Sequence, residues 1–341
     1  MKIAIDAQLT VGTATGIGEY VRGLIAALRA QGADVAELSE PQLDPWRFDR
    51  RVLWDQVQLP QRARAEGADV LHCASGTMPL RFERPMVVTV HDVAWLRVQA
   101  HTRPYARYYF GAFALHRYRD AARIAVDSNF SRGELLDLLD GYDPKRIEVV
   151  YPGVAADYCA LERRKGDGRT ILAVGTIERR KNLELIVRAL PSLAGAQLVA
   201  VGPPTPYQRE CEDLALELGV GNRVKFAGYV EREALLNLYA TCAVVAVPSR
   251  YEGFGYAAAQ ALCAGTPCVV SDVSALPEVV GGDAPTLSLD DADAWVNALA
   301  SALRGERDAG ALSARDPSRS RFAWDVSARR MQDVYRASVD G

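Results

Sequence analysis

Residues 170–202 read TILAVGTIERRKNLELIVRALPSLAGAQLVAVG, and this stretch decides the fold class. Two short runs rich in Val, Leu and Ala, at 170–175 and 197–202, flank a segment at 182–190 that reads as a helix. The runs do not alternate apolar with polar residues, so both faces of each strand must be covered by other elements. The stretch therefore predicts parallel strands in a sheet with helices on both faces.

The same succession of strands and helices runs through the rest of the chain and predicts two doubly wound α/β domains. Further strands are predicted at 2–7, 69–74, 86–92, 123–128, 146–153, 224–230, 243–249 and 267–272. The polar stretch ERRKGDGR at 162–169 is the candidate boundary. We expect an N-terminal Rossmann-like domain over 1–160, joined by the amphipathic C-terminal helix at 322–341, and a second such domain over 161–321. Ligands of such sheets bind beyond the carboxyl ends of the strands, so chemistry is expected in a cleft between the domains.

Length and charge exclude several classes of protein. The 341 residues suggest two domains at ~150 residues each. A net charge of −3 provides no basic field for nucleic acid. The six cysteines form no CxxC pair and read as core residues in a reducing cytosol. The sequence shows neither a signal peptide nor an apolar run near the ~20 residues of a membrane span, so a cytoplasmic protein is expected.

Three cations, Arg179, Arg180 and Lys181, stand between the strand at 170–175 and the helix at 182–190. A basic triplet is usually a solvated charge run, but here a strand end and the N–H groups of a helix start both favour an anion. Cations fixed beside a departing diphosphate stabilise its charge without a metal ion. We therefore expect phosphate binding here, and neither a metal nor a cofactor. The acidic run at 290–293 is interpreted as a helix N-terminus.

The segment EGFG at 252–255 follows the strand at 243–249 and precedes a helix at 256–265. Glycines on both sides of Phe254 let the backbone approach a ligand closely. The N–H groups at the helix start suit an anion or sugar hydroxyls, and an acid suits hydrogen bonds donated by sugar hydroxyls. The alternative is that Glu252 only caps the helix.

Four segments, in order along almost the whole chain, resemble the retaining GT-B glycosyltransferases of family 4. They are GTATGIGEYVRGL (12–24), VVTVHD (87–92), GTIERRKNLELIVRAL (175–190) and the region from PSRYEGFG to PEVVGGDA (248–284). The resemblance implies a nucleoside diphosphate sugar as donor and transfer of the sugar, with retention of configuration, to an acceptor hydroxyl. By this resemblance Arg180 and Lys181 contact the diphosphate and Glu252 contacts the donor sugar. The backbone around Phe254 is expected to contact the same sugar and phosphate through Gly253, Phe254 and Gly255.

The resemblance assigns weaker roles to residues at other strand ends. His91 borders the reaction centre while Asp92 orients its loop, although a lone histidine is more often structural. Tyr229 and Val230 recognise the base through backbone groups, the alternative being a strand terminus with a buried tyrosine. In the loop from Gly12 to Gly18, the resemblance implies that Gly16 and Gly18 let the donor diphosphate or the acceptor approach the first domain. The alternative is that this loop is only a flexible connection. Ser131 is expected to cap the helix that follows it.

The chain departs from the family pattern at two positions. The second glutamate of the family motif, which holds the ribose hydroxyls, is Gln260 here. A carboxamide has one acceptor oxygen and a donating NH₂, so we expect nucleotide binding weaker by ~1 kcal/mol, unless Gln260 only packs the helix and the ribose is held elsewhere. Gly175 and Thr176 stand where some relatives have Gly-Arg, so one arginine contact to the diphosphate is missing.

The predicted reaction is same-face transfer of a hexose, with mannose from GDP-mannose as the predicted donor. The acceptor is predicted to be a lipid-linked glycan for surface polysaccharide. The basic and aromatic segment at 103–119 could contact an anionic membrane surface, although such stretches are more often helices with snorkelling side chains. Two rival functions stay open: a GT-B sugar-nucleotide epimerase, and a non-catalytic nucleotide-sugar-binding subunit.

Overall fold

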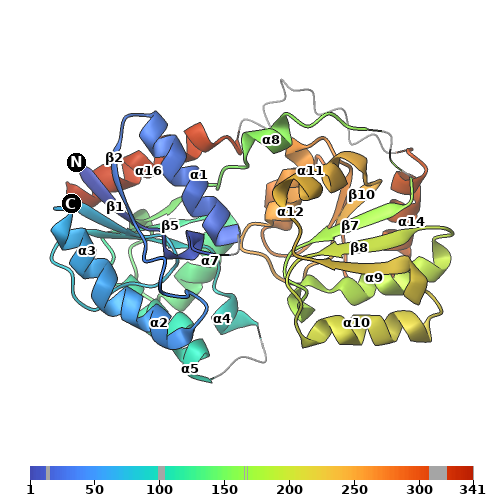
Figure 1. The fold of residues 1–341 in the computed structure, drawn as a ribbon, viewed down its shortest axis with the longest axis horizontal. Helices are drawn as coiled ribbons and strands as arrows, with labels where there is room; N and C mark the ends of the chain where they lie inside the picture. The colour runs from blue at the N-terminus through green and yellow to red at the C-terminus, as the bar shows by residue number, and fades with distance from the viewer. Residues whose placement is uncertain (13–15, 99–103, 165, 167, 307–320, 341) are drawn as a thin grey trace. The chain divides into compact units, whose positions relative to one another are not determined.

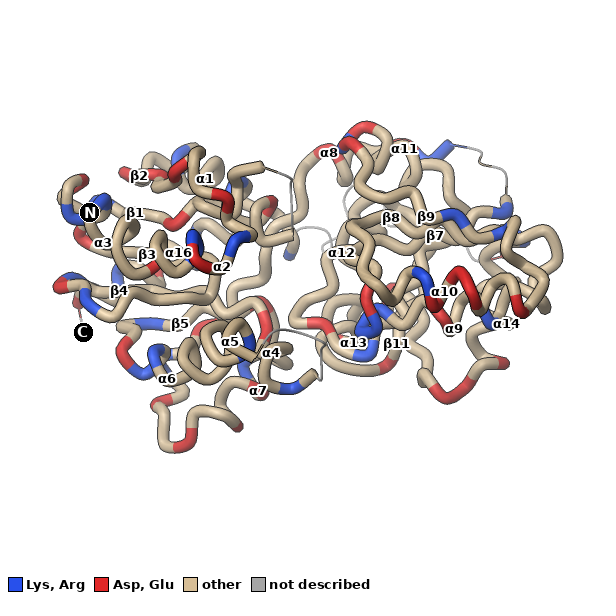
Figure 2. Tube along the Cα trace, turned by 60° about the horizontal axis from the view of Figure 1, so that its bottom comes forward, with Lys and Arg blue, Asp and Glu red and all other residues tan. Residues whose placement is uncertain are grey.

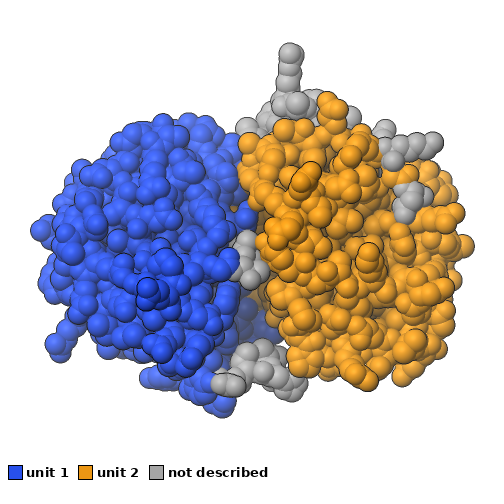
Figure 3. All heavy atoms as spheres, viewed as in Figure 1, with its two compact units in different colours: residues 1–153, 321–341 blue, residues 154–320 orange. Residues whose placement is uncertain are grey.

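The computed structural model describes residues 1–12, 16–98, 104–164, 166, 168–306 and 321–340. The chain forms two compact units (Figure 3): unit 1 is Met1–Gly153 with Arg321–Gly341, and unit 2 is Val154–Ser320. The C-terminal helix belongs to unit 1. The units divide before the polar stretch at 162–169, whose residues 165 and 167 lie outside the described part of the chain.

Unit 1 contains a parallel sheet with the strand order β2-β1-β3-β4-β5-β6 (Figure 1). Its strands are β1 (Lys2–Asp6), β2 (Asp34–Leu38), β3 (Val70–Cys73), β4 (Met86–Val90), β5 (Arg123–Val126) and β6 (Ile147–Val149). The predicted strands in this half are confirmed, and β2 is an additional one. The sequence analysis missed β2 because it is a partly exposed edge strand, DVAEL, that carries two acids among few apolar residues.

Helices α1 (Gly16–Ala30) and α16 (Trp324–Val339) pack together on one face of this sheet. The other helical elements of unit 1 are η1 (Gln8–Thr10), α2 (Phe48–Leu53), η2 (Trp54–Gln58), α3 (Leu59–Ala65), α4 (Ala94–Arg97), α5 (Pro104–Arg107), η3 (Tyr108–Phe113), α6 (Ala114–Tyr118), α7 (Asn129–Leu138) and η4 (Pro144–Arg146). The cap of α7 was predicted wrongly. Ser128 is the N-cap and accepts the Ser131 N–H at 3.0 Å, because Ser128 has the extended backbone of a cap while Ser131 lies inside the helix.

Unit 2 contains a second parallel sheet, with the strand order β12-β11-β10-β7-β8-β9. Its strands are β7 (Thr170–Val174), β8 (Gln197–Val201), β9 (Val224–Gly228), β10 (Val244–Val247), β11 (Cys268–Ser271) and β12 (Thr286–Leu287). The chain runs outward from β7 through β8 to β9 and then returns to β10 on the other side of β7. The strand order therefore reverses between β7 and β10, which makes this pair the switch point of the sheet.

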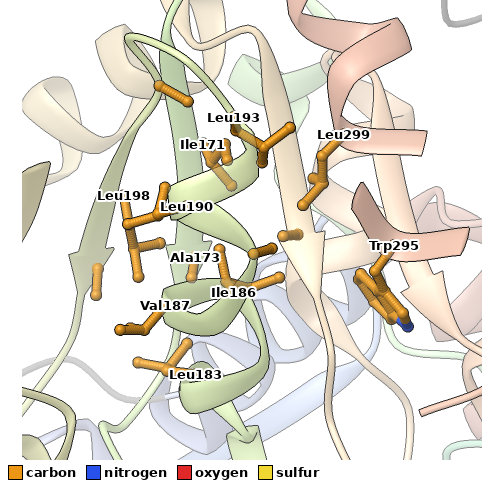
Figure 4. Close-up of a cluster of buried hydrophobic side chains, with 14 of the residues drawn as sticks. Ile171, Ala173, Leu183, Ile186, Val187, Leu190, Leu193, Leu198, Trp295 and Leu299 are labelled. Carbon is orange, nitrogen blue, oxygen red and sulfur yellow. The ribbon is translucent and has the colours of Figure 1, made fainter. Parts of the chain in front are cut away.

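Alternate strand residues divide the core of unit 2 between the two faces of its sheet. Ile171, Leu198 and Val244 face a buried cluster with α9 (Leu183–Ala189), α10 (Pro206–Glu217) and α14 (Ala292–Leu303) (Figure 4). Helices α11 (Arg232–Thr241) and α12 (Tyr256–Cys263) cover the other face (Figure 1). The remaining helical elements are α8 (Ala156–Cys159), η5 (Arg179–Lys181), η6 (Leu190–Ser192), η7 (Gly221–Arg223) and α13 (Leu276–Val280). The predicted fold class, two doubly wound parallel-sheet domains, is confirmed.

Charged residues of both signs are interspersed along both units (Figure 2). Asp291 caps α14 by accepting the Ala294 N–H at 2.9 Å, which confirms the interpretation of the acidic run at 290–293. Within the described residues, none of the helices combines the length and apolar character needed to cross a membrane.

Candidate functional site

The candidate site of unit 2 lies at the switch point of its sheet. Strands β7 and β10 are hydrogen-bonded neighbours, and the segments that follow them carry Arg180, Lys181 and Glu252. Ligands of open α/β sheets bind beyond the carboxyl ends of the strands at such a point. A small pocket there is lined by residues from both strand ends, among them Gly175, Lys181 and Ser249.

Arg180 and Lys181 are held in place by the turn that carries them. They end the one-turn helix η5, and Asn182 then takes a left-handed conformation with φ of 53° before α9 begins. The Arg250 N–H donates to the Arg180 carbonyl at 2.8 Å, and Arg250 Nη2 donates to the Asn182 side chain at 2.8 Å. The side chains of Arg180 and Lys181 are only 19% and 18% exposed, so both cations lie against the protein and not in bulk solvent.

Both cations converge on Glu252. Lys181 Nζ lies 2.6 Å from Oε1 of Glu252, and Arg180 Nη1 lies 3.1 Å from Oε2. Arg180 also donates to the Tyr251 carbonyl at 2.8 Å and to Glu178 at 2.7 Å. Glu252 is not the helix cap considered as an alternative, because the N-cap of α12 is Gly255.

Glu252 is a buried carboxylate that stays ionised. Burial raises the pKa of its carboxyl group, but the charges of Lys181 and Arg180 and the hydrogen bonds from Lys181 and Ser249 outweigh burial and lower the pKa to about 2. A group that holds its charge at every physiological pH can accept hydrogen bonds but cannot act as a general acid.

Three serines that the sequence analysis did not single out help to position Glu252, and of the three Ser249 is the one that contacts its carboxylate. Ser249 Oγ donates to Oε1 of Glu252 at 2.7 Å, and the Glu252 N–H donates to Ser274 Oγ at 3.0 Å. Ser271 Oγ donates to the Ser249 carbonyl at 2.5 Å. Ser274 has a φ of 57°, an uncommon value for a residue with a side chain and one that marks a constrained loop. The sequence provided little indication that these serines lie around Glu252, because serine is common in loops.

Two predicted glycines are explained by close contacts within unit 2. Gly175 has a φ of 135°, and a Cβ there would lie 3.0 Å from Lys181 Cε, so glycine leaves room for the lysine stem. Gly255 has a φ of 97°, and a Cβ there would lie 2.6 Å from Leu276 Cδ2. Gly255 is thus required by the packing of α12 on α13, in addition to any approach to a ligand. Gly253 and Phe254 beside it are buried.

The side chain of Gln260 is hydrogen-bonded to another residue of unit 2. Its Oε1 accepts a hydrogen bond from the hydroxyl of Tyr239 at 2.9 Å, and Tyr239 is fully buried. Burial raises the pKa of this hydroxyl well above its ordinary value, so it remains a donor. The single acceptor oxygen of the carboxamide is therefore used within the protein, in line with the helix-packing interpretation.

The residues predicted for base recognition lie just beyond β9, which ends at Gly228. Tyr229 is 47% exposed, so the alternative of a buried tyrosine at a strand terminus is wrong. Val230 and Thr176 are half-buried at the ends of β9 and β7. Arg179 pairs with Glu210 at 2.5 Å and stacks over Tyr207, which separates it from Arg180 and Lys181.

In unit 1, His91 follows β4 and is tied to the ends of the two neighbouring strands. Its Nδ1 lies 2.7 Å from Oδ2 of Asp127 and its Nε2 lies 3.0 Å from the Ala74 carbonyl. An ionised Asp127 and the Ala74 carbonyl can only accept hydrogen bonds, so this arrangement favours a ring that donates from both nitrogens. Burial lowers the pKa of His91, but Asp127, Ala74 and Asp92 outweigh burial and leave this pKa raised above 6.5. The surroundings of His91 thus favour its charged form, and Asp127 is a partner that the sequence analysis missed.

We expect Asp127→Asn to lower the pKa of His91, because the variant removes the carboxylate that favours the imidazolium. A histidine with a raised folded pKa contributes its full stabilisation below the unfolded value of 6.5 and loses it as pH rises through the folded pKa. NMR titration of the ring should show the shift, and urea midpoints between pH 6 and 9 should fall less steeply in the variant. Asp137→Asn, at an exposed carboxylate paired with Arg97, is the matched control. Superimposable titrations of the variant and wild type would contradict the assignment.

The predicted glycine loop at 12–18 is shorter than expected, and residues 13–15 lie outside the described part of the chain. Helix α1 already begins at Gly16, so Gly16 and Gly18 are helical. Gly18 is buried, whereas a Cβ at Gly16 would meet open space. No described protein atom near position 16 requires a glycine there, and the approach of a ligand at Gly16 and Gly18 stays a prediction.

Two doubly wound units, one with cations and a carboxylate at its switch point, define a protein of the GT-B class. Residues 14–158 match the family model described as Glycosyltransferase Family 4, and residues 160–318 match the model described as Glycosyl transferases group 1. A protein of Xylanimonas cellulosilytica named D-inositol 3-phosphate glycosyltransferase is 35% identical, over 96% of this chain and 93% of that protein. The chain belongs to these GT-B glycosyltransferases.

Solved structures share the same fold. Sucrose-phosphate synthase from Thermosynechococcus elongatus superposes with a TM-score of 0.77 at 24% identity, covering 98% of each chain. HepE from Anabaena, in complex with UDP-glucose, gives a TM-score of 0.75 at 16% identity, covering 99% of this chain and all of HepE. At these identities the likeness supports the fold alone.

Proposed function

We propose that this glycosyltransferase moves a hexose from a nucleoside diphosphate sugar to an acceptor hydroxyl with retention of configuration. The convergence of Arg180 and Lys181 with Glu252 at the switch point of unit 2 carries the proposal. These side chains come from two segments about 70 residues apart and lie where open α/β sheets bind their ligands.

In the proposed reaction the bond between the anomeric carbon and the diphosphate oxygen breaks, and the acceptor oxygen bonds to the same face of that carbon. The proton of the acceptor hydroxyl passes to the departing phosphate oxygen. Arg180 and Lys181 stabilise the negative charge that develops on the diphosphate. Glu252 accepts hydrogen bonds from the donor sugar, and His91 is proposed, from the family resemblance, to border the reaction centre.

We propose that the reaction requires no metal ion, because two fixed cations supply the charge stabilisation that a metal would otherwise provide. Turnover that persists in excess EDTA supports this part of the proposal. Activity abolished by EDTA and restored by one divalent cation argues against it.

The predicted donor is GDP-mannose, and the likeness to HepE, which was solved with UDP-glucose, makes UDP-glucose the donor to test beside it. A thermal-shift panel of UDP, GDP and their sugars separates them, because a ligand of the native state raises Tm by mass action. A donor that stabilises the protein is then incubated with and without acceptors. An epimerised nucleotide sugar formed without acceptor would identify the epimerase, and binding without turnover would identify the non-catalytic subunit.

The proposed acceptor is a lipid-linked glycan, brought to the enzyme by peripheral contact with a membrane. Exposed apolar side chains gather on neighbouring elements of unit 1, since Phe48 of α2 packs on Tyr105, Tyr109 and Phe110. The exposed apolar side chains on or beside these elements are Trp46, Leu53, Val57, Tyr105 and Tyr108. Residues 99–103, including the first residue of the basic segment predicted at 103–119, lie outside the described part of the chain. Because the Xylanimonas relative is named for inositol 3-phosphate, the acceptor panel includes a phosphorylated polyol beside lipid-linked glycans.

A further inference from the structure

The charges at the switch point of unit 2 are already balanced within the protein. Lys181 pairs with Glu252 at 2.6 Å, and Arg180 pairs with Glu252 at 3.1 Å and with Glu178 at 2.7 Å. The two cations therefore face two carboxylates, and the formal charge of these four side chains is zero. The cluster offers no net positive charge to an anion until one carboxylate gives up its cation.

The hydrogen-bonding capacity of Arg180 is also largely used. A guanidinium has five N–H donors. Arg180 makes four hydrogen bonds from its three nitrogens to Glu178, Tyr251 and Glu252. A diphosphate that binds to this side chain competes with these acceptors.

Glu252 is the acceptor that competes with a diphosphate for both cations, because it alone among the contacts above touches Arg180 and Lys181 together. It cannot escape to solvent, since Ser249 binds its carboxylate and Ser274 binds its backbone, and it is 6% exposed. A carboxylate held this firmly remains beside the cations and repels an incoming anion.

We propose that Glu252 is the resident counter-ion of the diphosphate site: its carboxylate competes with the ligand's diphosphate for Arg180 and Lys181. The identity of that ligand as a nucleoside diphosphate rests on the proposed function. While the diphosphate engages the cations, the Glu252 carboxylate stays in place and accepts hydrogen bonds from the sugar. When the diphosphate product leaves, Glu252 pairs with the cations again, which favours release of the product.

The test is isothermal titration calorimetry of inorganic pyrophosphate, UDP and GDP with wild type and Glu252→Gln, which keeps the shape and removes the charge. We expect these ligands to bind the variant about tenfold more tightly, as for one removed charge–charge repulsion in a largely buried site. Glu210→Gln is the matched control, because it removes an equal charge from the neighbouring Arg179 pair. Its affinity should stay within about twofold of wild type, as expected for an exposed pair.

Glu178→Gln provides a second, independent measurement should Glu252→Gln not fold. Glu178 touches Arg180 but not Lys181 in these pairs, and its side chain is 36% exposed, so the gain in affinity should be smaller. Equal or weaker binding of all three ligands to both variants overturns the counter-ion role. Tighter pyrophosphate binding by the variants, with no binding of UDP or GDP to any form, supports the counter-ion role and contradicts the proposed function.

Discussion

Lys181→Met is expected to lower kcat by about 10²–10³-fold, the usual cost of removing one group that stabilises charge in the transition state. The substitution keeps most of the apolar stem that fills the space left by Gly175, and it removes the ammonium that lies 2.6 Å from Glu252. Because the lost interaction grows as the diphosphate departs, kcat should fall more than KM rises. Steady-state kinetics with the donor found by the thermal-shift panel measures both constants.

Arg179→Met is the matched control for this variant. Arg179 precedes Arg180 in the same turn, but it is 57% exposed and pairs with Glu210. We expect kcat within about twofold of wild type, because exposed pairs contribute little. Equal losses in the two variants would show that general positive charge near the turn matters, and would remove the specific role given to Lys181.

Glu252→Ala is expected to bind nucleoside diphosphate at least as tightly as wild type but to lose transfer by about 10²-fold. This factor corresponds to one hydrogen bond to a charged group, of about 1.5–3 kcal/mol, lost from the donor sugar. Calorimetry with UDP or GDP measures the first effect, and product formation under saturating donor measures the second. The separation of binding from turnover distinguishes a residue that contacts the sugar from one that only maintains the fold.

Glu210→Ala serves as the control for Glu252→Ala, since it removes a carboxylate of unit 2 that pairs with Arg179, the neighbour of Arg180 and Lys181 in the turn. Its turnover should equal that of wild type. Normal transfer by Glu252→Ala refutes the role assigned to Glu252. Loss of both binding and the folded near-ultraviolet spectrum would show that Glu252 is needed for the structure of unit 2.

Local patterns were sufficient to predict most elements of the fold. Val- and Ala-rich runs that do not alternate identified the interior strands, because such strands are covered on both faces. The edge strands β2 (Asp34–Leu38) and β12 (Thr286–Leu287) were not predicted, because both are partly exposed and β12 has only two residues. The start of α1 at Gly16 was missed because glycine was read as a loop residue.

The candidate site could be predicted only in part. Arg180, Lys181 and Glu252 stand out because each follows a strand end, where ligands of such sheets bind. The sequence did not predict three contacts of the site: Asp127 with His91, Tyr239 with Gln260, and Ser274 with Glu252. Their residue types are common, and their partners lie 21 to 36 positions away.

The sequence by itself determined that parallel strands alternate with helices in two domains and that cations and an acid follow two strands of the second domain. Only the tertiary structure decided that β7 and β10 are neighbours, that both cations pair with Glu252, and that Asp127 lies against the His91 ring. The physical reason is the sequence separation of the residues that determine each property. Apolar spacing depends on residues within one turn or strand, whereas the charge state of a side chain depends on groups that the strand order brings beside it.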